Sequence, residues 1–337
     1  GKHKDIFHIL ETWEEPSAQN FRCHGCTNSC AVTSLTFSSG QKFYTGNRCR
    51  KIFNNGQRVT RGDNFFKTRY DTLFNCPTEP TGSPAGTIGI PRALSMYELY
   101  PFWCTFFREC GYKVVLSPPS DENIHERGVS SVMAENICFP AKLAHGHIVA
   151  LTEMGVDRIF MPIIVHERNE IRTANNSYNC PVVCSYADVI RSALDPEGQY
   201  HIPLDSPVFS LRKPVLFNKQ VHEYGKFLGI NRHRVAVAFK MALHAQQHYE
   251  KTVREEAQKA LDESRAAKRH ILAIACRPYH MDPLINHGIF DLIADLGADA
   301  IPADLLTAHF PGHSLSNCKV VTQWAYTNRL YAGAKAT

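Results

Sequence analysis

The sequence predicts an α/β protein with two Rossmann-like lobes built on parallel sheets, preceded by a small N-terminal Cys-rich metal-binding module. Three observations predict this fold class. A strand–helix–strand pattern occupies residues 87–116, a strand–helix unit recurs over 270–301, and four cysteines fall within residues 23–49. We expect three parts, the last of them truncated: the Cys-rich module with a linker (1–86), the first α/β lobe (87–200), and a helical connection with the second α/β lobe (201–337).

The N-terminal part is predicted to contain a lead-in, a hairpin and a linker. Residues 1–20 fit a short helix or an extended lead-in. Strands are expected at 31–37 and 42–44, because apolar and β-branched residues there flank a turn at Gly40. Residues 54–86 are rich in Asn, Gly, Pro, Thr and Asp, which is typical of a mostly irregular segment.

The first lobe is predicted to begin with an apolar strand at 87–91. A helix over 95–110 follows, because its apolar residues recur near the helical period and Gly111 can end it. A strand at 113–116 completes a βαβ unit, which implies a parallel sheet with a right-handed crossover. The next expected elements are a helix at 138–154, a buried strand at 157–164 and a helix at 187–194.

The second lobe is predicted to follow a proline-rich boundary. Residues 196–215 contain four prolines, which indicates a domain boundary. Helices are expected through 216–268, the longest over 234–268. A strand at 270–276, a helix at 286–296 and a strand beginning at residue 300 then form the second unit.

Composition argues against several classes of protein. The net charge is +5 over 337 residues, and no block of like charges suggests binding to nucleic acid. No run of 18 apolar residues and no secretory signal occurs, so we expect neither a membrane association nor secretion. We therefore expect a cytoplasmic, reducing compartment, where clustered cysteines more often indicate metal or redox chemistry than disulfides. The chain has twelve cysteines.

The first candidate site is the N-terminal cysteine cluster. Two thiols separated by two residues can bind one metal ion, and a third and a fourth thiol complete a tetrahedral thiolate site. This donor set fits structural Zn²⁺ or a [4Fe–4S] cluster, and the sequence does not separate the two. Free or paired thiols are the alternative. The predicted ligands are Cys23, Cys26, Cys30 and Cys49.

A second candidate site combines two cysteines of the first lobe. Cys138 is expected at a helix N-terminus, which favours the thiolate form. Cys180 follows the strand that ends near residue 164, and loops at the carboxyl ends of parallel strands are where α/β folds bind ligands. We therefore expect Cys180 to approach Cys138. For each, the alternative is a buried structural thiol.

A third candidate site follows the strand at 270–276. Arg277 and His280 are candidates for binding an anionic group of a substrate, with a polar turn that caps the helix as the alternative. The chain lacks the phosphate-binding and dinucleotide-binding glycine motifs and the nucleophile elbow. The cysteines Cys76, Cys104, Cys110 and Cys318 show no ligand spacing, and the second and third of them are predicted to belong to the core.

Several motifs, in this order, resemble the acyl-CoA dehydratase activase-related family. They are Cys-His-Gly-Cys-Thr-Asn-Ser-Cys at 23–30, Gly-Asn-Arg-Cys at 46–49, Gly-Ile-Pro-Arg-Ala-Leu at 89–94, Tyr-Pro-Phe-Trp at 100–103, Cys-Phe-Pro-Ala-Lys at 138–142, His-Gly-His at 145–147, Asn-Cys-Pro-Val-Val at 179–183, Arg-Pro-Tyr-His at 277–280, Gln-Trp at 323–324 and Asn-Arg at 328–329. The resemblance extends from about residue 21 to 331.

The resemblance implies a dehydratase-like, iron–sulfur redox component of an ATP-driven 2-hydroxyacyl-CoA dehydratase or activase system. In the related dehydratases, an ATPase activator passes one low-potential electron to a [4Fe–4S] cluster, and a 2-hydroxyacyl-CoA then loses its hydroxyl group. Cys138 and Cys180 match the family's cluster ligands. A further ligand is expected in a loop beyond Thr337. A related group holds a double-cubane cluster and reduces small molecules.

The resemblance also implies partners. ATPase activator domains, in the same polypeptide or a separate chain, are expected, together with an acyl-CoA substrate and a dimeric assembly. Phosphate loops of an ATPase are absent, so no ATP hydrolysis is assigned to this chain. The rival hypotheses are a non-catalytic, zinc-stabilised scaffold that docks the ATPase domains and a thiol redox protein.

Overall fold

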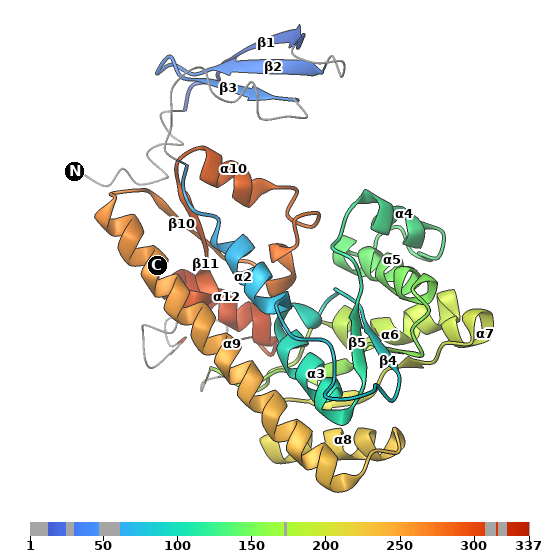
Figure 1. Cartoon of the computed structure of the whole chain (residues 1–337). Coiled ribbons are helices and arrows are strands. Elements are labelled where there is room, and N and C mark those ends of the chain that lie inside the picture. Colours follow the sequence, from blue (N-terminus) through green and yellow to red (C-terminus); the bar gives the residue numbers. More distant parts are fainter. Residues whose placement is uncertain are drawn as a thin grey trace. The chain divides into compact units, whose positions relative to one another are not determined.

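Figure 1 shows the computed structural model of the chain, which describes residues 13–24, 30–46, 61–171, 174–306, 315 and 322–336. Contacts group the chain into two compact units, Gly1–Thr60 and Arg61–Thr337. Helices and several parallel sheets occur together, which confirms the predicted α/β class. In the part of the chain that the structure describes, no helix has the length and apolar character needed to cross a bilayer.

The first unit contains a three-stranded antiparallel sheet in the order β1-β2-β3. The two predicted strands are confirmed, and a further strand, β1, ends the expected lead-in. A T-shaped contact between the Phe21 and Tyr44 rings, with centroids 6.2 Å apart, crosses the sheet. The strands are β1 (Ser17–Arg22), β2 (Ala31–Thr36) and β3 (Lys42–Thr45).

The second unit begins with a helix that the sequence did not predict. Helix α2 (Phe65–Phe74) lies within the segment expected to be irregular, and that expectation is wrong here. The Asn64 side chain caps the helix by accepting a hydrogen bond from the Lys67 backbone N–H at 3.2 Å. Phe66 and Leu73 are buried in the core. Tertiary packing and a cap therefore outweigh the polar composition of this segment.

The larger sheet is parallel throughout, in the order β5-β4-β6-β8, and it contains the predicted βαβ unit. The single strand expected at 157–164 is divided in two. Pro162 cannot donate to a ladder, and after it the chain leaves this sheet, so that β7 pairs with β9. The strands are β4 (Thr87–Ile90), β5 (Lys113–Leu116), β6 (Arg158–Phe160), β7 (Ile163–His166), β8 (Leu204–Asp205) and β9 (Val208–Ser210).

The predicted helices are found, one of them with an earlier start, and two short helices, α4 (Glu122–Val129) and α7 (Pro196–Tyr200), were not predicted. Helix α6 begins at Pro181, six residues before the expected position, because proline is favoured in the first helical turn. The remaining helices up to α9 are α3 (Met96–Cys110), α5 (Phe139–Glu153), α6 (Pro181–Leu194), α8 (Pro214–Phe227) and α9 (Arg232–Ala266).

A second parallel sheet, formed by β10 and β11, shares one hydrophobic core with α2, α3, α8 and α9. Figure 1 shows the long helix α9 running along α3, with which it packs. Trp103 is fully buried, and its ring lies 4.6 Å from Phe160 and 4.9 Å from Phe209. The remaining elements are β10 (Ile271–Ile274), η2 (Pro278–Met281), α10 (Ile289–Asp295), β11 (Asp299–Pro302), α11 (Ala303–Leu306) and α12 (Ala325–Ala336).

Candidate functional site

The first predicted thiol, Cys138, occupies the N-cap of α5. Its backbone is extended (φ −63°, ψ 146°), and Pro140 lies in the first turn of the helix. The thiol makes no capping hydrogen bond, and the residue is exposed. An exposed thiol is available to a metal ion, and the positive end of the helix dipole favours negative charge at this position.

The second predicted thiol, Cys180, occupies the N-cap of α6, directly before Pro181. It is half-buried, and its backbone N–H is hydrogen-bonded to the Asn179 side-chain oxygen at 2.9 Å. The Asn179 amide nitrogen in turn donates to the Glu167 carboxyl at 2.7 Å. Cys180 is therefore joined through one amide to a fully buried carboxyl group.

Both thiols affect the pKa of Tyr279, which belongs to η2. Burial raises the pKa of the Tyr279 phenol, and the neighbouring Arg277 guanidinium opposes that rise. Electrostatic contributions from Cys138 and Cys180 add to the rise. Because charge effects weaken over about 10 Å, Tyr279 lies within electrostatic reach of both helix N-termini.

Arg277 and His280 form two hydrogen bonds with each other across the turn after β10. The Arg277 backbone N–H donates to the His280 Nδ1 at 3.1 Å, and the His280 N–H donates to the Arg277 carbonyl at 3.0 Å. The Arg277 guanidinium lies 5.5 Å from the centre of the Tyr326 ring. Its buried NH1 group has no hydrogen-bond partner among the described residues. His280 therefore serves the turn, whereas Arg277 keeps a donor for another group.

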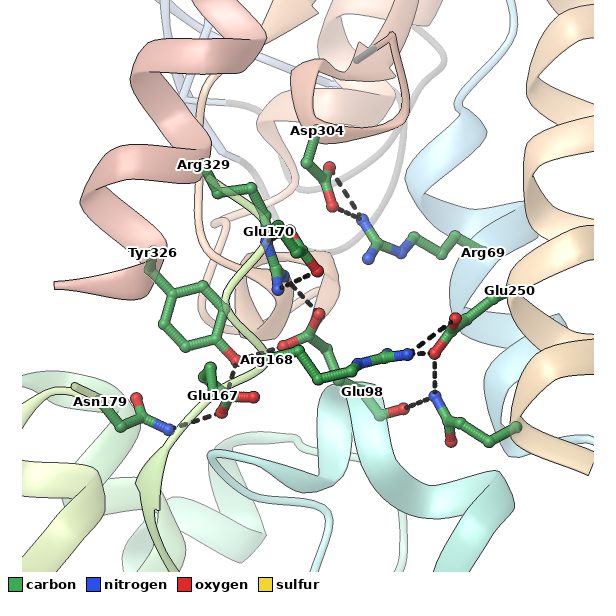
Figure 2. Close-up of polar contacts among 11 residues, drawn as sticks. Arg69, Glu98, Glu167, Arg168, Glu170, Asn179, Glu250, Asp304, Tyr326 and Arg329 are labelled. Carbon is green, nitrogen blue, oxygen red and sulfur yellow. Dashed lines mark hydrogen bonds and ion pairs between the residues drawn. The ribbon is translucent and has the colours of Figure 1, made fainter. Parts of the chain in front are cut away.

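Asn179, which joins Cys180 to Glu167, also connects Cys180 to a buried charge cluster that the sequence did not predict (Figure 2). The Tyr326 hydroxyl donates to Glu98 and lies 3.5 Å from Glu167. Arg329 pairs with Glu98, and also with Glu170 at 3.1 Å. The outer members of the cluster form the pairs Arg168–Glu250 and Arg69–Asp304.

The two central carboxyl groups of the charge cluster differ in protonation. Burial alone would raise the pKa of Glu98, but Arg329 and the hydrogen bond from Tyr326 outweigh it and lower the pKa. Burial raises the pKa of Glu167 to about 8, and the Glu98 carboxylate adds to the rise. At neutral pH, Glu167 therefore holds a proton beside an ionised Glu98.

A cavity of about 390 Å³ adjoins this cluster. Both signs of charge line it, so it is not a general anion site. Its charged lining consists of Arg69, Glu98, Arg168, Glu170, Glu250, Arg254, Asp304 and Arg329. These residues come from six separate parts of the chain, and only the polar run after β7, at residues 166–170, gave a local signal in the sequence.

The predicted N-terminal metal module is described only in part. Cys23 and Cys30 lie opposite each other, directly after the end of β1 and directly before the start of β2, and the Cys23 N–H donates to the Cys30 carbonyl at 2.8 Å. Cys26 and Cys49 lie outside the described residues. Across the described ranges, no group of three or more His, Cys, Asp or Glu side chains is arranged to hold a metal ion. Metal binding by this module stays a prediction.

The two histidines that follow Cys138 are buried and neutral. Ser117 and Ser120 contact the two ring nitrogens of His147 at 2.9 and 3.0 Å. His145 contacts the Tyr186 hydroxyl at 3.0 Å. Burial lowers the pKa of His145 to about 4 and that of His147 to about 3. These two side chains of α5 therefore connect the helix to its neighbours through hydrogen bonds.

Comparison with known proteins gives one match. No curated protein and no solved structure matches this chain. Residues 87–306, well over half of the chain, match the family model described as the CoA enzyme activase uncharacterised domain. This segment includes β4 to β11, both helix N-termini with their thiols, and the turn with Arg277. The chain therefore belongs to the CoA enzyme activase-related family.

Proposed function

We propose that this chain is a dehydratase-like redox component that accepts low-potential electrons at an iron–sulfur cluster, a [4Fe–4S] or double-cubane cluster, bound by Cys138 and Cys180. The observation that carries the proposal is the position of both thiols at the starts of α5 and α6, within the electrostatic reach of Tyr279. Membership of the activase-related family supports it. An ATPase activator domain is the proposed electron donor, and an acyl-CoA is the proposed substrate.

The donor set fits such a cluster in kind. Thiolates are the ligands that iron–sulfur clusters take, and two helix N-termini stabilise the negative charge that thiolates and sulfide bring. Two thiols are fewer than the four ligands of a [4Fe–4S] cluster, and the described residues offer no group of three or more metal-binding side chains. The proposal therefore requires ligands in addition to Cys138 and Cys180.

When bound, an iron–sulfur cluster supplies one-electron transfer at a potential set by burial and by hydrogen bonds to sulfur. The chain's own residues would position the substrate and protons. The free NH1 group of Arg277 is suited to an anionic group on a substrate. Glu167, joined to Cys180 through Asn179, holds a proton next to this site.

The test is anaerobic reconstitution of the full chain with iron and sulfide, followed by metal and sulfide analysis. The variants are Cys138→Ser, Cys180→Ser and, as a matched control, Cys184→Ser. Cys184 lies on the same helix as Cys180, and its thiol donates to the Ile164 carbonyl at 3.4 Å.

The proposal expects iron and sulfide in the wild-type protein and in Cys184→Ser, with a loss in both other variants. Equal iron content in all four proteins would overturn it, and so would a wild-type protein that binds no iron. Circular dichroism of each variant separates loss of the cluster from loss of the fold.

A second candidate function is a zinc-stabilised scaffold, and one observation favours it. Residues directly opposite in an antiparallel ladder have their side chains on the same face, about 5 Å apart, which suits two ligands of one ion. Cys23 and Cys30 continue the ladder beyond the Arg22–Ala31 pair. Under this proposal, zinc fastens the N-terminal hairpin so that it can dock the ATPase domains.

Zinc analysis of the full chain distinguishes this candidate. One zinc per chain that is lost in Cys23→Ser, but kept in Ser39→Ala at the β2–β3 turn, is the expected result. Zinc bound equally by both variants, or by neither the variants nor the wild-type protein, contradicts it.

A further inference from the structure

Two cysteines outside the proposed site converge on one carbonyl oxygen. Cys76 follows α2, and Cys104 lies in the middle of α3. Their sulfur atoms lie 3.7 and 3.4 Å from the Pro77 carbonyl oxygen. The Cys76 sulfur also lies 3.9 Å from the Thr105 hydroxyl. Two thiols that are far apart in the sequence therefore share one hydrogen-bonding environment.

The two thiols are unequal in exposure and acidity. Cys104 is fully buried, whereas Cys76 is half-buried and lines a cavity of about 990 Å³. A hydrogen bond from Cys104 lowers the pKa of Cys76 to about 7, against the effect of burial and with help from Thr105 and Arg108. The hydrogen bond with Cys76, together with burial, raises the pKa of Cys104. One accessible thiolate beside one buried thiol is the arrangement that thiol–disulfide exchange needs.

The cavity has the size to admit a small molecule, and both signs of charge line it. Its volume is in the range of small-molecule sites. Arg92 lines it, with its guanidinium 4.4 Å from the centre of the Phe74 ring, and Arg108 lines it near Cys76. The other charged or titratable lining residues are Tyr70, Asp71, His244, His248, Tyr249 and Glu256.

We propose that Cys76 and Cys104 form a thiol–disulfide exchange site for small-molecule disulfides, which enter the cavity that Cys76 lines. Cys76 is the attacking thiol and Cys104 is the resolving thiol. This site is independent of the proposed iron–sulfur site, because it uses neither Cys138 nor Cys180.

The reaction balances in two steps. The Cys76 thiolate attacks one sulfur of the substrate disulfide, so that a mixed disulfide forms, the substrate S–S bond breaks and the first thiolate leaves. Cys104 then gives its proton to that thiolate and attacks the Cys76 sulfur, which releases the second thiolate. The substrate gains two electrons and becomes one thiol and one thiolate, which takes its proton from solvent, while the pair is oxidised to a Cys76–Cys104 disulfide.

The test uses the full chain, reduced and then exposed to glutathione disulfide at pH 7, with quenching by alkylation and peptide mass spectrometry. The wild-type protein is expected to yield a Cys76–Cys104 disulfide. Cys104→Ser is expected to accumulate glutathione on Cys76, because no resolving thiol remains. The matched control, Cys110→Ser, alters another buried thiol of α3 and should behave as the wild type does.

Failure of Cys104→Ser to form the adduct, with a native circular dichroism spectrum, overturns the proposal. Formation of disulfides between other cysteine pairs but not between Cys76 and Cys104 overturns it as well.

Discussion

Replacing Glu167 by glutamine should stabilise the protein relative to the wild type, and this stabilisation should be larger at pH 8 than at pH 5. Glutamine has the shape of a protonated glutamate, and it can still accept the hydrogen bond from Asn179. The side chain is 4% exposed and faces Glu98, Tyr326 and Arg329, with Arg168 and Glu170 as the other charges nearby.

The size of the effect on stability follows from the difference between the pKa of Glu167 in the unfolded and in the folded protein. The ordinary pKa of a glutamate is near 4.5, and that of Glu167 in the folded protein is about 8. Below pH 4.5 both states hold the proton, and between these values only the folded state keeps it. Stability contributed by this group therefore falls as pH rises, by as much as about 5 kcal/mol in total.

The assay is urea unfolding of both proteins at pH 5, 6, 7 and 8, with Glu223→Gln as the control. Glu223 is exposed and pairs with Lys219 at 3.8 Å, so its substitution should change stability by less than about 1 kcal/mol. The difference between Glu167→Gln and the wild type should grow with pH. A constant difference, or a variant that is less stable than the wild type at pH 8, would refute a protonated Glu167.

Three further predictions concern other parts of the second unit. Asp304→Asn should lower the free energy of unfolding by about 3–5 kcal/mol in urea titrations, because it removes the negative charge beside the Arg69 guanidinium, 7% exposed, whose NH1 group contacts both Asp304 oxygens; an effect below about 1 kcal/mol would contradict this. Gly146→Ala should destabilise the protein by about 1–3 kcal/mol in the same assay, since a Cβ there would lie 1.7 Å from the Ile124 carbonyl oxygen, where α4 crosses α5; an unchanged unfolding midpoint would show that the crossing relaxes. Alkylation of Cys76 should show a pH midpoint near 7, against about 12 for Cys110, when followed by peptide mass spectrometry; equal midpoints would contradict the asymmetry between these thiols.

The predicted α/β class rested on periodicity, and most elements of the second unit followed from it. The helix of α3 and its flanking strands show the 3.6-residue and apolar-run patterns that local sequence carries well. Helix α2 was missed because polar segments flank it on both sides and its stability comes from burying Phe66 and Leu73 against distant elements. The break between β6 and β7 depends on a partner strand, β9, that no local pattern reveals.

The candidate site was predictable only in its local parts. Cys138 was found because it lies at the start of a predicted helix, and Cys180 because it follows a predicted strand; the start of α6 directly after Cys180 was not foreseen. The charge cluster was missed because Glu98, Glu167 and Arg329 come from three distant elements, so their pairing depends on the fold as a whole. Cys76 and Cys104 were missed for the same reason, since their separation in the sequence matches no motif.

The most direct test of electron acceptance is electron paramagnetic resonance of the reconstituted full chain after chemical reduction under anaerobic conditions. The account predicts the signal of a reduced iron–sulfur cluster in the wild-type protein and in Cys184→Ser, and its absence when Cys138 and Cys180 are both replaced by serine. The same signal in that double variant would show that the two helix N-termini do not bind the electron-accepting group.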